Sequence, residues 1–250
     1  MTRKRQCISV VRNALFALTT AAAAAFALLA REAPAFAQAR FGDKGQLAIT
    51  GENLFSLQTE RFAESPPPLG LEFAVTQNRF GFLYSQGTPS PHGPQAGIHF
   101  FVIPSLSIGG TIGYEARGGS HTERRGPGES VVVTLDDADS STFNLQFKIG
   151  YALMFSDVVG LWFRGGPGYF RVGTQQPANG DKDTWSYWLL SLDALLVVSP
   201  FRNFAFYAGP QGDISFAGSR SHTEDGVTAS WGGTYRDIGI GLGLIGYVNL

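Results

Sequence analysis

The feature that most constrains this chain is an alternation of apolar and polar residues with a period of two. Successive side chains of an extended strand point to opposite faces, so this period predicts strands with one apolar and one polar face. In the segment 237–250, DIGIGLGLIGYVNL, the apolar residues alternate with Gly239, Gly241 and Gly243. Seven further segments show the pattern: 46–58, 95–103, 106–116, 142–155, 159–170, 185–198 and 204–216. The alternation therefore predicts eight strands and an all-β fold.

The connections between these segments alternate in length. The expected connections are 59–94 (long), Pro104-Ser105 (short), 118–140 (long), Ser156-Asp157 (short), 175–183 (medium), 199–203 (short) and 219–229 (medium). Short turns at one end and longer loops at the other are typical of outer-membrane barrels. We therefore predict, for residues 40–250, an eight-stranded antiparallel up-and-down transmembrane β-barrel, with both mature termini at the short-turn end.

One further segment, 71–84, has a strand-like pattern that changes parity at TQNR. It lies between the Pro-rich stretches ESPPPLG and GTPSPHGP, which are typical of loops. We expect it to form a hairpin or strand extension within the long first outer loop, 59–94. If it crossed the membrane instead, the barrel would have nine or ten strands.

Glycines on the polar faces indicate what each face of the barrel meets. The apolar face points inward in a soluble lipocalin-like barrel, but it faces lipid in an outer-membrane barrel. Gly97, Gly150 and Gly241 are among many glycines on the polar faces, whereas bulky Phe, Leu, Ile and Tyr occupy the opposite faces. The narrow interior of an eight-stranded barrel has room for few large side chains. The glycines therefore favour lipid on the apolar face, and a soluble periplasmic lipocalin-like binder is the alternative.

Ionisable residues of both signs share these polar faces. They predict a lumen charge network of Glu52, Glu115, Lys148, Arg164, Asp193, Asp213 and Asp237. Buried charges need partners, so we expect salt bridges that largely fill the lumen. Eight strands enclose a space just wide enough for side chains, which excludes a wide pore and leaves a gated ion path as the sharper alternative. His99 is expected to face the lumen as a hydrogen-bonding residue.

The N-terminus has the organisation of a secretory signal peptide. Four basic residues in MTRKRQCISVVRN precede the apolar run 14–30, and Ala35-Phe36-Ala37 and Ala37-Gln38-Ala39 both fit the A-x-A rule. We predict cleavage after Ala37 or Ala39, so that residues 1–39 are removed. A transmembrane helix is the alternative, but the apolar run is short for one and is dominated by small residues.

Removal of residues 1–39 changes the charge and the cysteine content. It takes away five of the 19 basic residues and one of the 20 acidic residues, which leaves a net charge near −5. This charge argues against a nucleic-acid partner. The single cysteine, Cys7, also leaves, so the mature chain has no disulfide and no thiolate metal site.

The signal peptide, the eight alternating strands and the C-terminal strand together resemble the small outer-membrane β-barrel proteins of Gram-negative bacteria, the family of OmpX and the OmpA transmembrane domain. The resemblance covers residues 44–250, and no motif in it is specific to a subfamily. In that family the last strand is an assembly signal that usually ends in Phe, whereas this chain ends in Leu250. The resemblance implies a monomer that contacts lipid and lipopolysaccharide and uses its C-terminal strand to engage the barrel assembly machinery. No peptidoglycan-binding domain is expected after it.

The tetrapeptide SHTE occurs twice, at 120–123 and 221–224. Both copies are expected in outer loops, four strands apart around the barrel, which makes His121, Glu123, His222 and Glu224 the outer-loop candidates. Together they present ligand types for a divalent metal, and Ser beside His suggests acyl transfer. The simpler interpretation, which we adopt, is that they are polar loop residues, because a flexible loop does not fix the geometry that a nucleophile needs. No metal and no cofactor are predicted.

Aromatic residues near the predicted strand ends are candidates for the girdles of a membrane barrel. They are Tyr114, Phe155, Trp162, Tyr169, Trp185, Trp188, Phe201 and Phe204. The stretch RGGPGYF, 164–170, superficially resembles a phosphate loop, but it lacks the Lys-Ser/Thr ending and a following helix. We interpret it as a kinked barrel strand.

These observations predict a non-enzymatic outer-membrane protein that presents outer loops for surface interaction or envelope integrity. The alternative of a different class is a lipid A-modifying enzyme, which resembles the small outer-membrane deacylases and acyltransferases. Such an enzyme needs a His and a Ser fixed at the lipid-facing outer edge, and only the two SHTE copies offer that pair.

Overall fold

The computed structural model describes residues 40–64, 73–82, 84–85, 93–125, 131–176 and 180–250. The described residues belong to one compact unit, and the predicted signal peptide, 1–39, lies outside them. Over the described ranges, no helix is long and apolar enough to cross a membrane.

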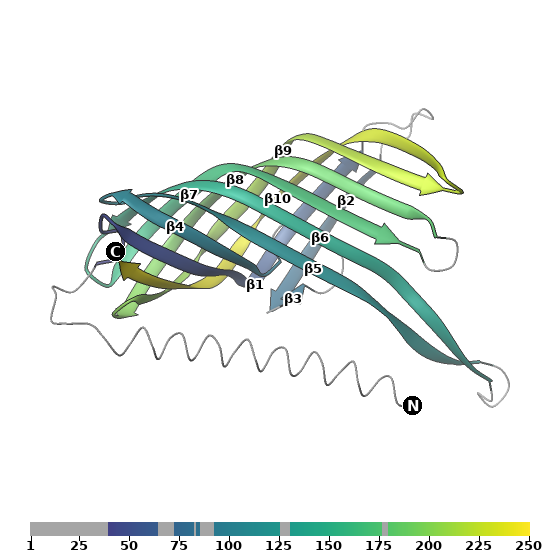
Figure 1. The fold of residues 1–250 in the computed structure, drawn as a ribbon, viewed down its shortest axis with the longest axis horizontal. Helices are drawn as coiled ribbons and strands as arrows, with labels where there is room; N and C mark the ends of the chain where they lie inside the picture. The colour runs from purple at the N-terminus through teal and green to yellow at the C-terminus, as the bar shows by residue number, and fades with distance from the viewer. Residues whose placement is uncertain (1–39, 65–72, 83, 86–92, 126–130, 177–179) are drawn as a thin grey trace. The chain divides into compact units, whose positions relative to one another are not determined.

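Within the described residues, ten antiparallel strands form one sheet (Figure 1). They are β1 (Gln46–Glu64), β2 (Phe73–Phe82), β3 (Tyr84–Ser85), β4 (Gln95–Ile103), β5 (Leu106–Arg125), β6 (Val131–Met154), β7 (Val159–Gln175), β8 (Lys182–Phe201), β9 (Phe204–Glu224) and β10 (Val227–Asn249). Eight of them form a closed ring in the order β1-β4-β5-β6-β7-β8-β9-β10, and β10 pairs back onto β1 from Gln46↔Asn249 onward. The prediction of an eight-stranded antiparallel barrel is confirmed.

The strand β1 changes partner on one side part-way along its length. Its first residues, 47–52, pair with β4, and after a bulge at 52–54 its residues 55–64 pair with β2. Asn53 within the bulge has a φ of 54°, in the left-handed region that Asn tolerates better than most residues. The strand-like segment 71–84 therefore contributes β2 and the first residue of β3. Strand β2 extends the sheet beside residues 55–64 of β1, and neither strand belongs to the ring of eight.

The two faces of the sheet have the polarity of a membrane barrel. On β6, the side chains of Asn144, Gln146 and Lys148 are each 2% exposed, while the alternating Leu145 and Phe147 are nearly half exposed. The same arrangement recurs on β1, β4, β8 and β10. Apolar residues outside and polar residues inside fit a hydrocarbon environment. The soluble lipocalin-like alternative, which requires the apolar face inside, is wrong.

The outer ends of the strands are longer than the alternation predicted. The paired strands β5 and β6 continue to Arg125↔Val131, so most of the expected loop 118–140 is a hairpin that extends beyond its neighbours (Figure 1). The expected loop 219–229 is reduced to a two-residue turn, Asp225-Gly226. Its φ values of 49° and 78° are those of a type I′ hairpin turn, for which Asp-Gly is a favoured sequence.

Gly226 provides a test of this turn. Substitution with alanine is expected to lower the free energy of unfolding by about 1 kcal/mol, because a side chain at positive φ is strained. No atom lies within 4 Å of the added Cβ, so steric crowding contributes nothing. Urea unfolding in lipid vesicles measures the change. Gly246→Ala is the matched control, since its added Cβ also meets nothing within 4 Å and no positive φ is involved; an equal loss in both variants would contradict the turn assignment.

The girdle candidates are exposed at some positions and buried at others. Tyr114, Phe155, Trp188 and Phe201 are 52–70% exposed on the outer surface. Trp162 is fully buried inside the barrel, and Trp185 packs against an interior aromatic cluster. Both tryptophans share the parity of inward-facing residues on their strands, so alternation, and not nearness to a strand end, decides their side.

Candidate functional site

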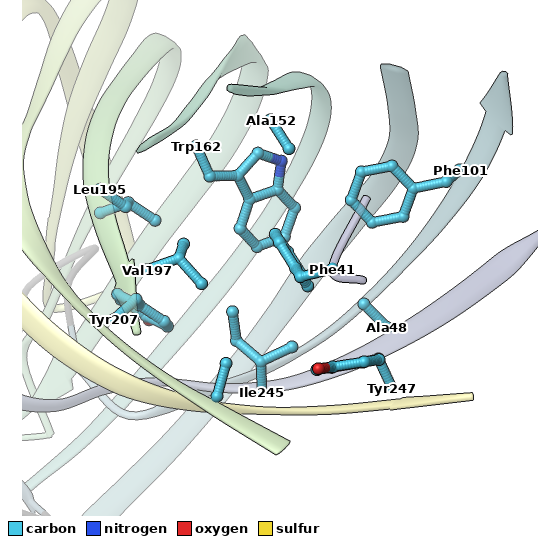
Figure 2. Packing of buried hydrophobic residues seen from close by; sticks show 11 residues of the cluster. Phe41, Ala48, Phe101, Ala152, Trp162, Leu195, Val197, Tyr207, Ile245 and Tyr247 are labelled. Carbon is cyan, nitrogen blue, oxygen red and sulfur yellow. The ribbon is translucent and has the colours of Figure 1, made fainter. Parts of the chain in front are cut away.

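The interior of the barrel is the candidate site, and it is filled in layers. The layer at the short-turn end is apolar and contains Phe41, Phe101, Trp162, Tyr207 and Tyr247 (Figure 2). Phe41 is 1% exposed, and its ring makes edge contacts with the rings of Phe101, Trp162 and Tyr247 at centroid distances of 5.2–5.6 Å. The segment before β1 thus places one aromatic side chain in the mouth of the barrel.

Backbone and side-chain hydrogen bonds hold this segment in place. Gly42 and Gly45 have φ values of 96° and 80°, which let the chain turn tightly before β1. Gly45 N donates to Phe101 O at 2.8 Å, and Leu250 N donates to Gly45 O at 3.1 Å. Gln46 Oε1 accepts from Gly42 N at 2.9 Å. The turn is therefore attached to β4 and to the C-terminal residue, and we refer to residues 40–45 as the N-terminal plug.

A charged layer lies next to this apolar one and is centred on Arg164 of β7. Arg164 forms a two-point ion pair with Glu52 of β1, at 2.5 Å from Nη1 to Oε1 and 3.0 Å from Nη2 to Oε2. It also reaches Asp193 of β8, with Nη2 2.8 Å from Oδ2. The guanidinium lies 4.5 Å from the ring centroid of Trp162, a cation–π contact that joins the two layers.

Lys148 and His99 complete the charged layer. Lys148 Nζ is 2.8 Å from Asp193 Oδ2 and 3.6 Å from Glu52 Oε2. His99 Nε2 lies 3.6 Å from Glu52 Oε1 and 3.3 Å from Arg164 Nη1, and the imidazole ring also packs edge-on against Trp162. All five side chains are at most 5% exposed. The group joins opposite walls of the barrel, so it cross-links the lumen.

The other predicted members of the network lie at different heights. Asp213 and Asp237 are cross-strand partners on β9 and β10, and Asp237 accepts hydrogen bonds from Asp213 N at 2.8 Å and from Tyr235 Oη at 2.6 Å. Gln146 Nε2 lies 3.5 Å from Asp213 Oδ2. Glu115 pairs with Arg117 on its own strand at 2.6 Å. The contacts described here place Glu52, Lys148, Arg164 and Asp193 in one four-charge cluster, Asp213 beside Asp237, and Glu115 beside Arg117.

A second apolar layer, rich in aromatic residues, lies toward the outer ends of the strands. It consists of Phe170, Val172, Tyr187, Leu189 and Tyr235, with Phe62 and Trp185 packed against it. Phe62 and Tyr235 are 4.8 Å apart between ring centroids, and they come from strands that close the ring. The described interior therefore contains aromatic, charged, polar and again aromatic layers.

The outer-loop candidates on β9 are placed differently from the prediction. His222 and Glu224 lie in β9 and not in a loop, because β9 continues to Glu224. His222 Nδ1 is 3.1 Å from Asp183 Oδ1 on the neighbouring strand, and His222 Nε2 is 3.8 Å from Glu224 Oε2.

The other copy of the tetrapeptide is also in a strand. The backbone of His121 and Glu123 belongs to β5, paired with Leu135 and Val133, and their side chains lie outside the described residues. The structure therefore corrects the placement of both copies from loops to strands. Among the described side chains, no group of three or more His, Cys, Asp or Glu has an arrangement that would hold a metal ion.

Sequence reasoning missed two components of the interior. Phe41 lies before the first alternating segment, so no periodicity marks it. Trp162 stands between the outward Leu161 and Phe163, so its parity would have placed it inside with Arg164. Its indole Nε1 donates to Ser107 Oγ at 3.2 Å, which satisfies the one polar atom of this buried ring.

Comparisons with known proteins agree with this geometry. No protein-family model matches the chain, and no curated protein matches it. The solid-state NMR structure of the outer-membrane protein AlkL in lipid bilayers matches with a TM-score of 0.53 and 13% identity, over 88% of this chain and 97% of that one. The chain has the fold of a small outer-membrane β-barrel. At this identity the similarity establishes the fold alone.

Further solved structures match this barrel more loosely. OprG from Pseudomonas aeruginosa matches with a TM-score of 0.48 and 9% identity, over 84% of this chain and 99% of that one. The outer-membrane protease OmpT from Escherichia coli matches with a TM-score of 0.42 and 9% identity, over 85% and 99%. A fold does not determine a function, so the function of this barrel has to be argued from its side chains.

Proposed function

We propose that this barrel is a non-enzymatic, monomeric protein of the outer membrane that presents its outer strands for surface interaction or envelope integrity. The observation that carries the proposal is the cross-linked lumen. The four-charge cluster around Arg164, which we call the Arg164 cluster, connects β1, β6, β7 and β8. It lies between the two apolar layers. In this proposal the filling of the described interior leaves an eight-stranded barrel no water path wide enough for a nutrient-sized solute.

The outer side supports a role in presentation. The β5–β6 hairpin and the β9–β10 hairpin both extend past the aromatic residues on the outer surface. In this proposal residues 1–39 direct export and are cleaved, the C-terminal strand engages the barrel assembly machinery, and the outer surface contacts lipid and lipopolysaccharide. The net charge near −5 is unsuited to a nucleic-acid partner, and no cofactor is required.

The position of His222 does not favour a lipid A-modifying enzyme. That alternative needs a His and a Ser fixed together at the lipid-facing edge. His222 instead follows the inward parity of Arg220 on β9, and its imidazole contacts Asp183. Lipid A extracted from a strain that lacks the protein is expected to be unchanged, and altered acylation would favour the enzyme.

Electrical recording tests the closed lumen. Purified protein inserted into a planar lipid bilayer is expected to give no stable conducting state under physiological salt, because the Arg164 cluster fills the cross-section. Arg164→Ala is expected to introduce discrete conducting events. Stable openings of the unmodified protein would contradict the proposal and would support the gated ion path.

A further inference from the structure

Arg40 lies directly before the buried Phe41 and is held at both of its main-chain polar atoms. Its nitrogen donates to Asp43 Oδ2 at 2.9 Å. Its carbonyl oxygen accepts from Asp43 N and from Gln46 Nε2, each at 3.2 Å. The guanidinium group binds elsewhere and donates to Met154 O at the end of β6. Arg40 is therefore fixed at the barrel mouth, with its main-chain nitrogen directed at a carboxylate.

A tight turn brings the carboxylate of Asp43 back to this nitrogen. The hydrogen bond from Asp43 N to Arg40 O closes a four-residue turn, and Gly42 at its third position has a φ of 96°, which a type II turn requires. Phe41 occupies the second position and packs in the apolar layer at the mouth (Figure 2). The turn that buries Phe41 thus also places a carboxylate beside the nitrogen of the preceding residue.

This carboxylate would bind a charged nitrogen more strongly than a neutral one. A peptide N–H supplies one neutral donor, whereas an α-ammonium supplies three N–H groups and a positive charge. The charge adds Coulomb attraction to the carboxylate. Asp43 is half-buried, so solvent screens the pair less than it would on an open surface. The position of Asp43 therefore suits a chain whose first residue is Arg40.

The sequence allows the chain to begin at Arg40. Ala37-Gln38-Ala39 fits the A-x-A rule, and cleavage after it frees the nitrogen of Arg40. The overlapping segment 35–37 also fits the rule. Cleavage after Ala37 would leave Gln38 and Ala39 attached, so that the nitrogen of Arg40 would stay in a neutral peptide bond. The contact with Asp43 distinguishes between these two positions.

We propose that the chain is processed between Ala39 and Arg40, and that the new α-ammonium group pairs with Asp43 to anchor the N-terminal plug. A peptidase of the cell envelope hydrolyses the bond with one water molecule, which leaves a carboxylate on Ala39 and an ammonium on Arg40. The inference rests on the export and cleavage proposed above. It adds the position of the cut and the partner of the new terminus.

Intact-protein mass spectrometry of the protein purified from outer membranes tests the position of the cut. The expected mass is that of residues 40–250. The mass of residues 38–250 would overturn this inference and leave the proposed export intact, whereas the mass of the full chain would overturn both. Ala39→Leu is expected to abolish the cut before Arg40, because a small residue is required at that position. Ala35→Leu, outside the segment 37–39, is the matched control; a changed mass in this variant would indicate cleavage after Ala37 and overturn the inference.

An aminopeptidase, which requires a free and accessible N-terminus, tests the pairing. Asp43→Asn removes the charge and is expected to lose Arg40 about tenfold faster than the unmodified protein, because trimming follows the population in which the terminus is released. Asp43→Glu keeps the charge and is expected to be trimmed more slowly than Asp43→Asn. Asp157→Asn, at an exposed aspartate in the β6–β7 turn, is the matched control and is expected to be trimmed at the unmodified rate.

Heat-dependent gel mobility verifies that each variant is a folded barrel before it is exposed to the aminopeptidase. Equal trimming of Asp43→Asn and Asp157→Asn would show that the carboxylate does not hold the terminus, which would overturn the pairing. If Asp43→Asn did not fold, the comparison of Asp43→Glu with the unmodified protein would replace it. Faster trimming of Asp43→Glu is then the expected result, because the longer side chain displaces the carboxylate from the nitrogen of Arg40, and equal trimming would overturn the pairing.

Discussion

Replacing Arg164 with alanine is expected to lower the free energy of unfolding by about 3–5 kcal/mol. The guanidinium contacts Glu52, Asp193 and Trp162 together. After its removal Lys148 still lies 2.8 Å from Asp193 and 3.6 Å from Glu52, so one lysine faces two buried carboxylates. Unpaired buried charge costs more than the ion pair itself contributes, so the loss exceeds that of any surface arginine. Urea unfolding of the protein in lipid vesicles measures it.

Two further variants make this result specific. Arg236→Ala removes an exposed arginine on β10 and is expected to change stability by less than about 0.5 kcal/mol. Adding Glu52→Gln to Arg164→Ala neutralises one orphaned carboxylate, and it is expected to recover part of the lost stability. If Arg164→Ala unfolded like Arg236→Ala, the charged layer would contribute nothing to the barrel. If the double variant were less stable than Arg164→Ala alone, Lys148 would be sufficient to compensate the charge of both carboxylates.

Parity along the strands was sufficient to predict which residues enter the lumen. Glu52, Lys148, Arg164 and Asp193 come from four strands, and alternation along each strand alone places each of them inside. Alternation is strong there because one face meets hydrocarbon and the other meets a crowded interior. The same contrast decided the polarity of the barrel, since glycine accumulates only where opposing walls come close.

The height of each residue within the lumen was not predictable from parity. Height depends on the stagger between strands, and a single bulge, such as the one at 52–54 of β1, changes the stagger. Glu115 shares its face with the network yet pairs with Arg117 nearer the outer end of β5. Asp213 and Asp237 are neighbours through the β9–β10 register alone. A face can therefore be predicted from one strand, but a contact requires the register of two.

The outer strand ends were mispredicted for a related physical reason. Beyond the exposed Tyr114 and Trp188 both faces of the sheet are expected to meet polar surroundings, so the sequence is no longer constrained to alternate. The stretches 118–125 and 219–224 contain Gly, Ser, Thr and charged residues on both faces and were assigned to loops, although both continue as paired strands. The Asp-Gly dipeptide at 225–226 was the available signal, because it favours a two-residue hairpin turn and thus implies paired strands on either side.

Phe41 lies outside every repeating pattern, and its substitution is the second large effect that we expect. Phe41→Ala should lower the free energy of unfolding by about 3–5 kcal/mol, the range for deleting a fully buried phenylalanine. Its ring contacts three other aromatic rings from three strands, and all three contacts would be lost. Urea unfolding in vesicles measures the stability.

A local measurement separates loss of the plug from general weakening of the barrel. Trp162 is fully buried against Phe41, so in a variant that keeps only this tryptophan, Phe41→Ala is expected to raise fluorescence quenching by acrylamide. Phe155→Ala, at the same end but 62% exposed, is the control and is expected to leave both quenching and stability nearly unchanged. Unchanged quenching in Phe41→Ala would mean that the barrel mouth is closed without the N-terminal plug. Increased quenching would show that residues just after the predicted cleavage site complete the interior, which would make processing of the N-terminus part of barrel closure.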